Sequence, residues 1–191
     1  MSLNWLYCNL FIVILFFNIV KSDTDTNPDI DRFVEIADDR LTLSDYVALY
    51  KVVNNKTITD LKREEQLLDD MRSKGKKLSL NEDYVTLIFQ DQMNASKHFQ
   101  NYLVNLWNQH GIPPIKVRDL ETDLRPKIDQ INNEMLQLLV KIQKLPSADC
   151  LKEVDKSLKN FIMRVNDIDE QIDALKMAVK GGDLCPACKN N

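Results

Sequence analysis

The sequence predicts an all-α protein, folded as a single-domain bundle of about five to six long helices. Three observations support this fold class. The chain has 191 residues, of which 44% are hydrophobic and 28% charged, and this composition suits one sizeable core. Only 4 glycines and 6 prolines are present, so few positions interrupt a helix. The alternation of apolar and polar residues that predicts strands between turns does not occur.

The first two predicted helices have recognisable ends. The first spans about residues 28–53, because Pro28 is favoured in a first helical turn and the apolar residues after it recur with helical spacing. Thr59 or Asp60 can cap the second helix through a side-chain oxygen. We expect that helix to end near residues 74–75, where a lysine is followed by a glycine.

The third and fourth predicted helices lie on either side of a Gly-Ile-Pro-Pro break. Asn81 opens the third helix, which can continue almost to Gly111. Asp119 or Thr122 opens the fourth, and we expect it to reach residues 145–146. Both segments carry apolar residues at helical spacing, so the bundle interpretation holds across this break.

The last predicted helical region runs from about Asp149 to Lys180, where two consecutive glycines stop it. No proline or glycine lies within this region. Together the predicted helices form one domain, residues 23–191.

The N-terminal segment differs in kind from the rest of the chain. Residues 10–20 are apolar except for one asparagine, and Val20 and Ser22 are small residues placed for cleavage after Ser22. We therefore expect residues 1–22 to be a signal peptide. The alternative is a membrane anchor over residues 3–20, which is nearly long enough to span a bilayer. After cleavage the protein is expected to be secreted, outside the cell or into a periplasm, without membrane contact.

The charge distribution argues against a nucleic-acid partner, and the small number of metal-ligating residues argues against a metal site. The net charge is −4 and no long basic run occurs, so we do not expect a nucleic-acid partner. Cys185 and Cys188 form one Cys-Pro-Ala-Cys pair, but the only histidines are His98 and His110. Four metal ligands are difficult to assemble from this set, and we expect no metal site.

The cysteines predict one disulfide in the mature domain. Cys8 lies within the expected signal peptide, which leaves three cysteines in an oxidising compartment. We expect Cys150 to pair with Cys185, or with Cys188 as the alternative, and so to tie the C-terminal tail to the start of the last helical region. The remaining cysteine is then free or joined to another chain.

Several polar residues share helix faces in a way that needs an explanation. Arg40 and Lys51 are eleven residues apart, close to three full turns, so both point the same way. Asp60 and Arg63 also share a face, being three residues apart. Taken singly, these residues are readily explained as a solvated helix surface and a local ion pair.

Two further features follow the same pattern. Thr86 and Gln90 lie at the edge of the apolar stripe of the third predicted helix, and Arg125 lies in the first turn of the fourth. A cation at a helix start loses dipole energy rather than gaining it. A solvated edge explains Thr86 and Gln90 as well as a binding site does, so the choice depends on the rest of the chain.

Four sequence segments carry a more specific signal: DRLTLSDYVALYK (39–51), ITDLKREEQLL (58–68), NEDYVTLIFQDQMNASK (81–97) and LRPKIDQINNEML (124–136). In this order they resemble the secreted gamma-type AroQ chorismate mutases, the all-helical class. The resemblance covers nearly the whole mature chain. An N-terminal signal and a C-terminal disulfide are usual in that family, in agreement with the expectations above.

The resemblance implies a site for a small dianion. Arg40, Arg63 and Arg125 would contact the two carboxylates of chorismate. Lys51 would donate toward a carboxylate and toward the ether oxygen, and the hydroxyl of Thr86 would bind a carboxylate.

The resemblance also implies the contacts that do not involve carboxylates. Gln90 would donate to the ether oxygen, at a position where members of the class can carry glutamate. Asp60 would orient the cations. The substrate hydroxyl would be bound by Glu64, or by a residue one turn along, Gln66 or Leu67.

The implied reaction is the rearrangement of chorismate to prephenate, an isomerisation in aromatic amino acid biosynthesis. One C–O bond breaks as one C–C bond forms within the same molecule, so neither a nucleophile nor a cofactor is required. Bound cations and hydrogen-bond donors suffice to hold a compact conformer and stabilise developing charge. A homodimer with each site inside one chain is the expected assembly. The alternative function is a secreted helical binding or effector protein on the same bundle, without turnover.

Overall fold

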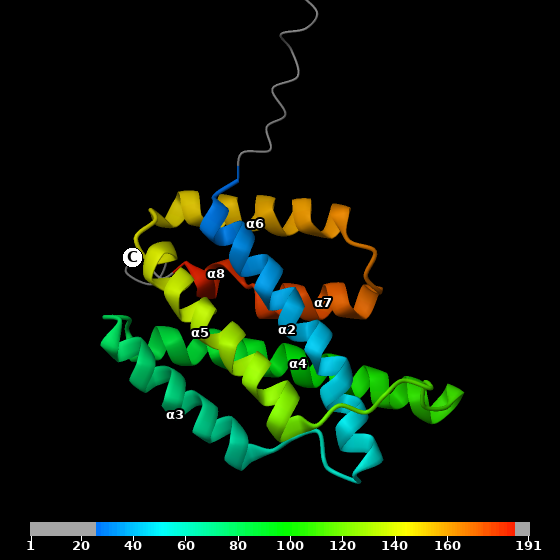
Figure 1. Cartoon of the computed structure of the whole chain (residues 1–191). Coiled ribbons are helices and arrows are strands. Elements are labelled where there is room, and N and C mark those ends of the chain that lie inside the picture. Colours follow the sequence, from blue (N-terminus) through cyan, green and yellow to red (C-terminus); the bar gives the residue numbers. More distant parts are fainter. Residues whose placement is uncertain (1–25, 186–191) are drawn as a thin grey trace, which may run out of the picture.

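The computed structural model describes residues 26–185, and within this range every regular element is helical (Figure 1). The elements are, in order, α2 (Pro28–Val53), α3 (Leu61–Lys77), α4 (Glu82–His110), the π-helix η1 (Leu120–Leu124), α5 (Arg125–Ile142), α6 (Ser147–Arg164), α7 (Asp169–Ala178) and α8 (Gly181–Leu184). The all-α prediction is confirmed. The expected signal peptide, residues 1–22, lies outside the described residues.

Helix α2 is the central element of the bundle. Asn27 caps its start by accepting hydrogen bonds from the backbone N–H groups of Asp29 and Ile30, at 3.0 and 3.3 Å. The helix then packs against α4, α5, α6 and α7; in Figure 1 it crosses α4, α6 and α7 and runs beside α5. Its predicted ends are confirmed. Because one helix contacts four others, residues along it can reach both ends of the molecule.

Helices α3 and α4 pack together beside α2. Asp60 caps α3 by accepting from the N–H of Arg63 at 3.1 Å. The predicted end of α3 near Gly75 is two residues short, because Gly75 is a packing residue rather than a helix stop. A Cβ on Gly75 would lie 2.7 Å from a methyl carbon of Val85 in α4, so glycine permits the close contact. Helix α4 ends at His110, as expected, and Gly111 follows it with a φ of 90°.

The fourth predicted helix is divided into a π-helical turn and a regular helix. Asp119 caps the turn through the N–H groups of Glu121 and Thr122, at 3.0 and 2.7 Å. The N–H of Leu124 then bonds to the carbonyl of Asp119, five residues back. Pro126 has no N–H to donate, so the regular hydrogen-bond pattern becomes complete only after it.

The last predicted helical region, from about Asp149 to Lys180, is divided into two helices. Helices α6 and α7 are separated by an extended break at 165–168, and in Figure 1 they form a hairpin. The break allows α6 to pack on α2 while α7 packs on both α2 and α4. The two glycines do not stop this region either, because α7 ends at Ala178 and Gly181 begins α8.

The predicted Cys150–Cys185 disulfide is confirmed, with an S–S distance of 2.02 Å. It joins the first turn of α6 to the residue after α8, and both cysteines are buried. The hydroxyl of Tyr84 donates to the carbonyl of Leu184 at 2.8 Å, which adds a second tie between α8 and the start of α4. Cys188 lies outside the described residues. Within 26–185, no helix has the length and apolar character needed to cross a membrane.

Candidate active site

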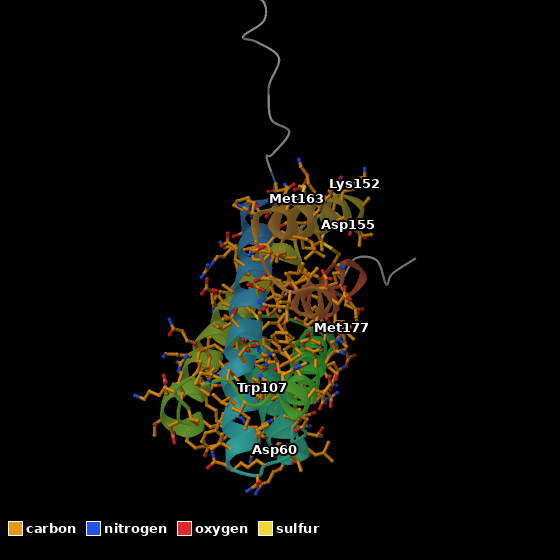
Figure 2. All side chains as sticks on the ribbon, turned by 90° about the vertical axis from the view of Figure 1, so that its right-hand side faces the viewer. Asp60, Trp107, Lys152, Asp155, Met163 and Met177 are labelled. Atoms are coloured by element: carbon orange, nitrogen blue, oxygen red, sulfur yellow. A yellow bond between two sulfur atoms is a disulfide. The ribbon has the colours of Figure 1, made fainter. Side chains whose placement is uncertain are left out.

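A pocket lies among α2, α3, α4 and the start of α5, at one end of the bundle. Figure 2 places Asp60, at its rim, far from Lys152 and Asp155 of α6 at the other end. Its lining residues are Arg40, Val47, Lys51, Ile58, Asp60, Arg63, Glu64, Leu67, Met93, Ser96, Lys97, Gln100, Leu120, Arg125 and Ile128. Six of the predicted site residues are therefore brought together: Arg40, Lys51, Asp60, Arg63, Glu64 and Arg125.

Arg40 is the most deeply placed cation of the pocket. Its side chain is only 6% exposed, and it donates to Asn132 Oδ1 at 3.2 Å and to the backbone carbonyl of Gln92 at 2.9 Å. Burial lowers the pKa of Arg40 to about 10, so the guanidinium stays charged at neutral pH. Both partners are uncharged, and no described carboxylate lies within ion-pair distance of it. Arg40 therefore keeps a net positive charge directed at the pocket.

Lys51 lies three turns further along α2, as the sequence spacing predicted. Its ammonium donates to the carbonyl of Ile58, in the loop between α2 and α3. Burial lowers the pKa of Lys51, and the negative charges of Asp60 and Glu64 oppose this effect. The loop carbonyl uses one of the three N–H donors of the ammonium, which leaves two for a ligand.

Arg63 and Arg125 complete the cationic wall from α3 and α5. Arg63 is 3.2 Å from Asp129 Oδ1, while Arg125 contacts Glu121 and lies 4.0 Å from Asp60 Oδ2. All three pairs are partly exposed to solvent, so each contributes modestly to stability and a bound anion can compete for the guanidinium groups. Asp60 thus contacts the start of Arg63's helix and the side chain of Arg125, as an orienting residue would.

Three predicted site residues do not reach the pocket. Gln66 is exposed on α3. Thr86 donates its hydroxyl to the carbonyl of Glu82 at 2.7 Å, and Gln90 donates to Asn94 Oδ1 at 3.2 Å, so both are engaged within α4. None of the three is among the residues that line the pocket.

The pocket instead uses a second occurrence of the same spacing, ten residues further along α4. Ser96 and Gln100 repeat the pattern of a hydroxyl residue followed four residues later by glutamine, about 15 Å along the helix axis. Gln100 is 4% exposed and donates through Nε2 to Ser96 Oγ at 2.8 Å. Ser96 Oγ is also 2.7 Å from Ser44 Oγ of α2. This repeat was the available sequence signal, and it was missed because the crossing point of α2 and α4 was unknown.

Lys97 is a further pocket residue that the sequence interpretation did not select. Its ammonium lies 2.8 Å from Glu64 Oε2 across the α3–α4 contact, and the two side chains are 25% and 18% exposed. Counting this lysine, five cationic and two acidic side chains line the pocket. The site therefore carries a positive excess within a chain whose net charge is negative.

Apolar side chains form the remaining walls. Leu120 of η1 and Val47 of α2 belong to a small cluster separate from the main core, and Ile128 packs against that cluster. Leu67 and Met93 contribute from the main core on the opposite helices. Such walls can accept the uncharged part of a small ligand, while the cations can hold its anionic groups.

The fold and pocket define a class of protein: an all-helical domain with a cationic, partly apolar pocket between four helices, which suits a small anion. Within residues 26–185, no group of three histidine, cysteine or acidic side chains is placed to hold a metal ion. The buried amide of Gln100 and the half-buried hydroxyl of Ser96 add hydrogen-bonding groups to the cationic site.

Comparisons with known proteins agree with this class. A family model described as chorismate mutase type II matches residues 30–101. The chain is 30% identical over 141 residues to the secreted chorismate mutase of Mycobacterium tuberculosis (strain ATCC 25618 / H37Rv), an alignment covering 72% of this chain and 70% of that protein. It is 32% identical over 98 residues to the monofunctional chorismate mutase of Enterobacter agglomerans, covering 51% and 54% of the two chains.

The structural comparison extends over more of the chain. The crystal structure of chorismate mutase from Burkholderia thailandensis superposes with a TM-score of 0.77 at 29% identity, and covers 83% of this chain and 100% of that chain. That from Burkholderia phymatum gives 0.76 at 27% identity, with 83% and 99% covered. The chain belongs to the chorismate mutase family.

Proposed function

We propose that this pocket converts chorismate to prephenate. The observation that carries the proposal is the convergence of Arg40, Lys51, Arg63 and Arg125 from three helices on one pocket. Chorismate is a dianion with two carboxylates, and guanidinium groups bind carboxylates through paired, charge-assisted hydrogen bonds. A pocket with a positive excess and apolar walls suits a small ring that carries two negative charges.

The proposed catalysis is conformational and electrostatic. The rearrangement occurs only when the enolpyruvyl side chain lies over the ring, so that the atoms forming the C–C bond are close. Cations that hold both carboxylates at once favour this compact conformer, because they fix the side chain and the ring in one geometry. Arg40 and Arg63 lie on different helices, so each can hold a different end of the substrate. No proton transfer is needed at any step.

Stabilisation of the transition state is assigned to Lys51 and Gln100. Negative charge grows on the ether oxygen as the C–O bond breaks, so donors aimed at that oxygen bind the transition state more strongly than the substrate. Lys51 has donors left after its bond to Ile58. Gln100 Nε2 has two hydrogens, and its bond to Ser96 occupies only one. Gln100 thus takes the role first expected of Gln90, and Ser96 that expected of Thr86.

The substrate hydroxyl is assigned to Glu64. Of the three residues first considered, Gln66 is exposed outside the pocket and Leu67 is apolar. The carboxylate of Glu64 lines the pocket and accepts a hydrogen bond from Lys97 on one oxygen. A carboxylate only accepts hydrogen bonds, and the ring hydroxyl is the donor that chorismate offers.

The proposal includes secretion and a homodimer in which each site lies within one chain. A secreted relative supports export, and one chain by itself brings five cationic side chains to the pocket. Mixing Arg40→Ala subunits with Arg125→Ala subunits should therefore restore no activity. Substantial recovery would mean that helices from two chains share a site.

The direct test is to produce residues 23–191 in an oxidising compartment and follow chorismate by its absorbance while prephenate is detected separately. Arg63→Ala serves as the control, with its helical content checked by circular dichroism. We expect turnover by the native sequence and a loss of several orders of magnitude in the variant. A protein that binds chorismate without forming prephenate would contradict the proposal in favour of a binding role.

A further inference from the structure

We propose that Lys97 is a positioning residue: it holds Glu64 away from the substrate-binding cations and fixes it where it can accept the substrate hydroxyl. This inference rests on the proposed function. Lys97 and Glu64 face each other from α4 and α3 at 2.8 Å, and both line the pocket. The pair therefore sets where one of the two acidic side chains of the site lies.

The two acidic side chains of the pocket differ in how many of their carboxylate oxygens already have a partner. Asp60 uses one oxygen to cap α3 and directs the other toward Arg125, at 4.0 Å. Glu64 accepts from Lys97 through Oε2, and within residues 26–185 its Oε1 has no hydrogen-bond partner. Glu64 is thus the acid whose second oxygen is available to a ligand.

An unrestrained Glu64 would have competing cations nearby. Its charge raises the pKa of Lys51, while the charge of Lys97 lowers it, so both groups lie close enough to act on that ammonium. Arg63, the residue directly before Glu64, carries a guanidinium on the same helix. Without Lys97, the carboxylate would be drawn toward Lys51 or Arg63 and would neutralise a charge that the substrate needs.

The pair also accounts for an acid inside an anion-binding site. A bare carboxylate would repel a dianion, and the partial burial of Glu64 would strengthen that repulsion. Lys97 offsets this charge without removing the acceptor. The pocket then favours a dianion that presents a hydroxyl over one that does not, because the unpaired acceptor disfavours the second ligand.

The test is a double-mutant cycle on the two residues, measured by steady-state kinetics with chorismate. Lys97→Met should raise KM about tenfold or more while kcat changes less than about threefold, because binding is lost rather than the ether-oxygen donors. Lys97→Arg should restore most of the binding. In a Glu64→Gln background, Lys97→Met should cost less than about twofold, since no carboxylate remains to be positioned.

Lys76→Met is the matched control. Lys76 of α3 pairs with Glu82 of α4 at 3.0 Å, so this variant removes a lysine that joins the same two helices outside the pocket. It should leave KM unchanged. An equal effect of Lys76→Met would assign Lys97 a merely structural role.

The cycle also distinguishes direct substrate binding by Lys97. If Lys97→Met costs the same in the native and Glu64→Gln backgrounds, Lys97 contacts the substrate itself and the proposal is overturned. It is equally overturned if Lys97→Met leaves KM and kcat as they were. A native protein without mutase activity would contradict the proposed function instead, because the cycle compares variants with an active parent.

Discussion

Replacing Gln100 by methionine should lower the activity without lowering the stability of the fold. Gln100 is 4% exposed, and its Oε1 is buried without a hydrogen-bond partner in the described part of the chain. The bond from Nε2 to Ser96 contributes about 1 kcal/mol, whereas an unpaired buried carbonyl costs about 1–3 kcal/mol. Methionine has a similar length and removes both groups. The free energy of unfolding should therefore stay unchanged or rise by up to about 2 kcal/mol.

Activity should fall in the same variant. Loss of one donor to a developing oxyanion costs about 100- to 1,000-fold, or about 2.7–4 kcal/mol in transition-state stabilisation. We expect this loss in kcat/KM for Gln100→Met, measured from the decay of chorismate absorbance. Urea denaturation followed by circular dichroism supplies the free energy of unfolding.

Gln92→Met is the matched control on the same helix. Gln92 is 1% exposed and donates to the carbonyl of Ala178 at 2.9 Å, away from the pocket. Its replacement leaves that carbonyl without this donor, so we expect a loss of about 1–3 kcal/mol in stability and near-native kcat/KM. The reasoning is refuted if Gln100→Met keeps kcat/KM within about threefold of native, or if it destabilises the fold as much as Gln92→Met does.

Other regions of the molecule support three more predictions. Thr86→Val and Gln90→Met should each keep near-native kcat/KM, because neither residue lines the pocket. A large loss of kcat/KM in either variant would show that the residue does take part in the site. Burial raises the pKa of Asp38 from 3.8 to about 6, so the folded state binds the proton more tightly and stability falls as pH rises between these values. Asp38→Asn should therefore add about 1 kcal/mol to the free energy of unfolding at about pH 7.5, a magnitude already reduced because the side chain is partly exposed. Near about pH 4 the same substitution should add almost nothing, and equal gains at both pH values would contradict this prediction. Removing the disulfide, which spans a sequence separation of 35, by Cys150→Ser and Cys185→Ser together should cost about 3–4 kcal/mol by chain entropy, and unchanged urea denaturation would contradict this estimate.

Local capping chemistry made most helix starts predictable. Asn81 and Asp119 are short polar residues before apolar runs, and both accept backbone N–H bonds at the starts of their helices. The α6–α7 hairpin was not predictable in the same way. Its break contains no glycine or proline, and the residues around it keep enough helical periodicity to suggest continuity. Only the packing of two apolar faces on different neighbours requires the chain to turn there.

Four of the five pocket cations, all except Lys97, were predictable because charged residues on a shared face, in segments that resemble a known family, stand out in the sequence. The hydrogen-bonding residues of α4 were not, because their position along the helix depends on where α2 crosses it. In the structure, Arg40 meets the Gln92 carbonyl and Ser44 meets Ser96, which fixes that crossing. Sequence alone offered two equivalent pairs on α4, and it did not reveal which pair lines the pocket together with Lys51.

The π-helical turn Leu120–Leu124 makes one wall of the pocket sensitive to the length of the chain. A π-helix closes its hydrogen bonds over one residue more than an α-helix does. Helix α5 is held by buried residues such as Asn132 and Met135, so loss of one residue from the turn would leave Arg125 in place. The shortened turn would instead rotate Leu120 by about 100° relative to Val47. Single-residue insertions and deletions here thus offer relatives a way to diverge in ligand affinity while all the cations are retained.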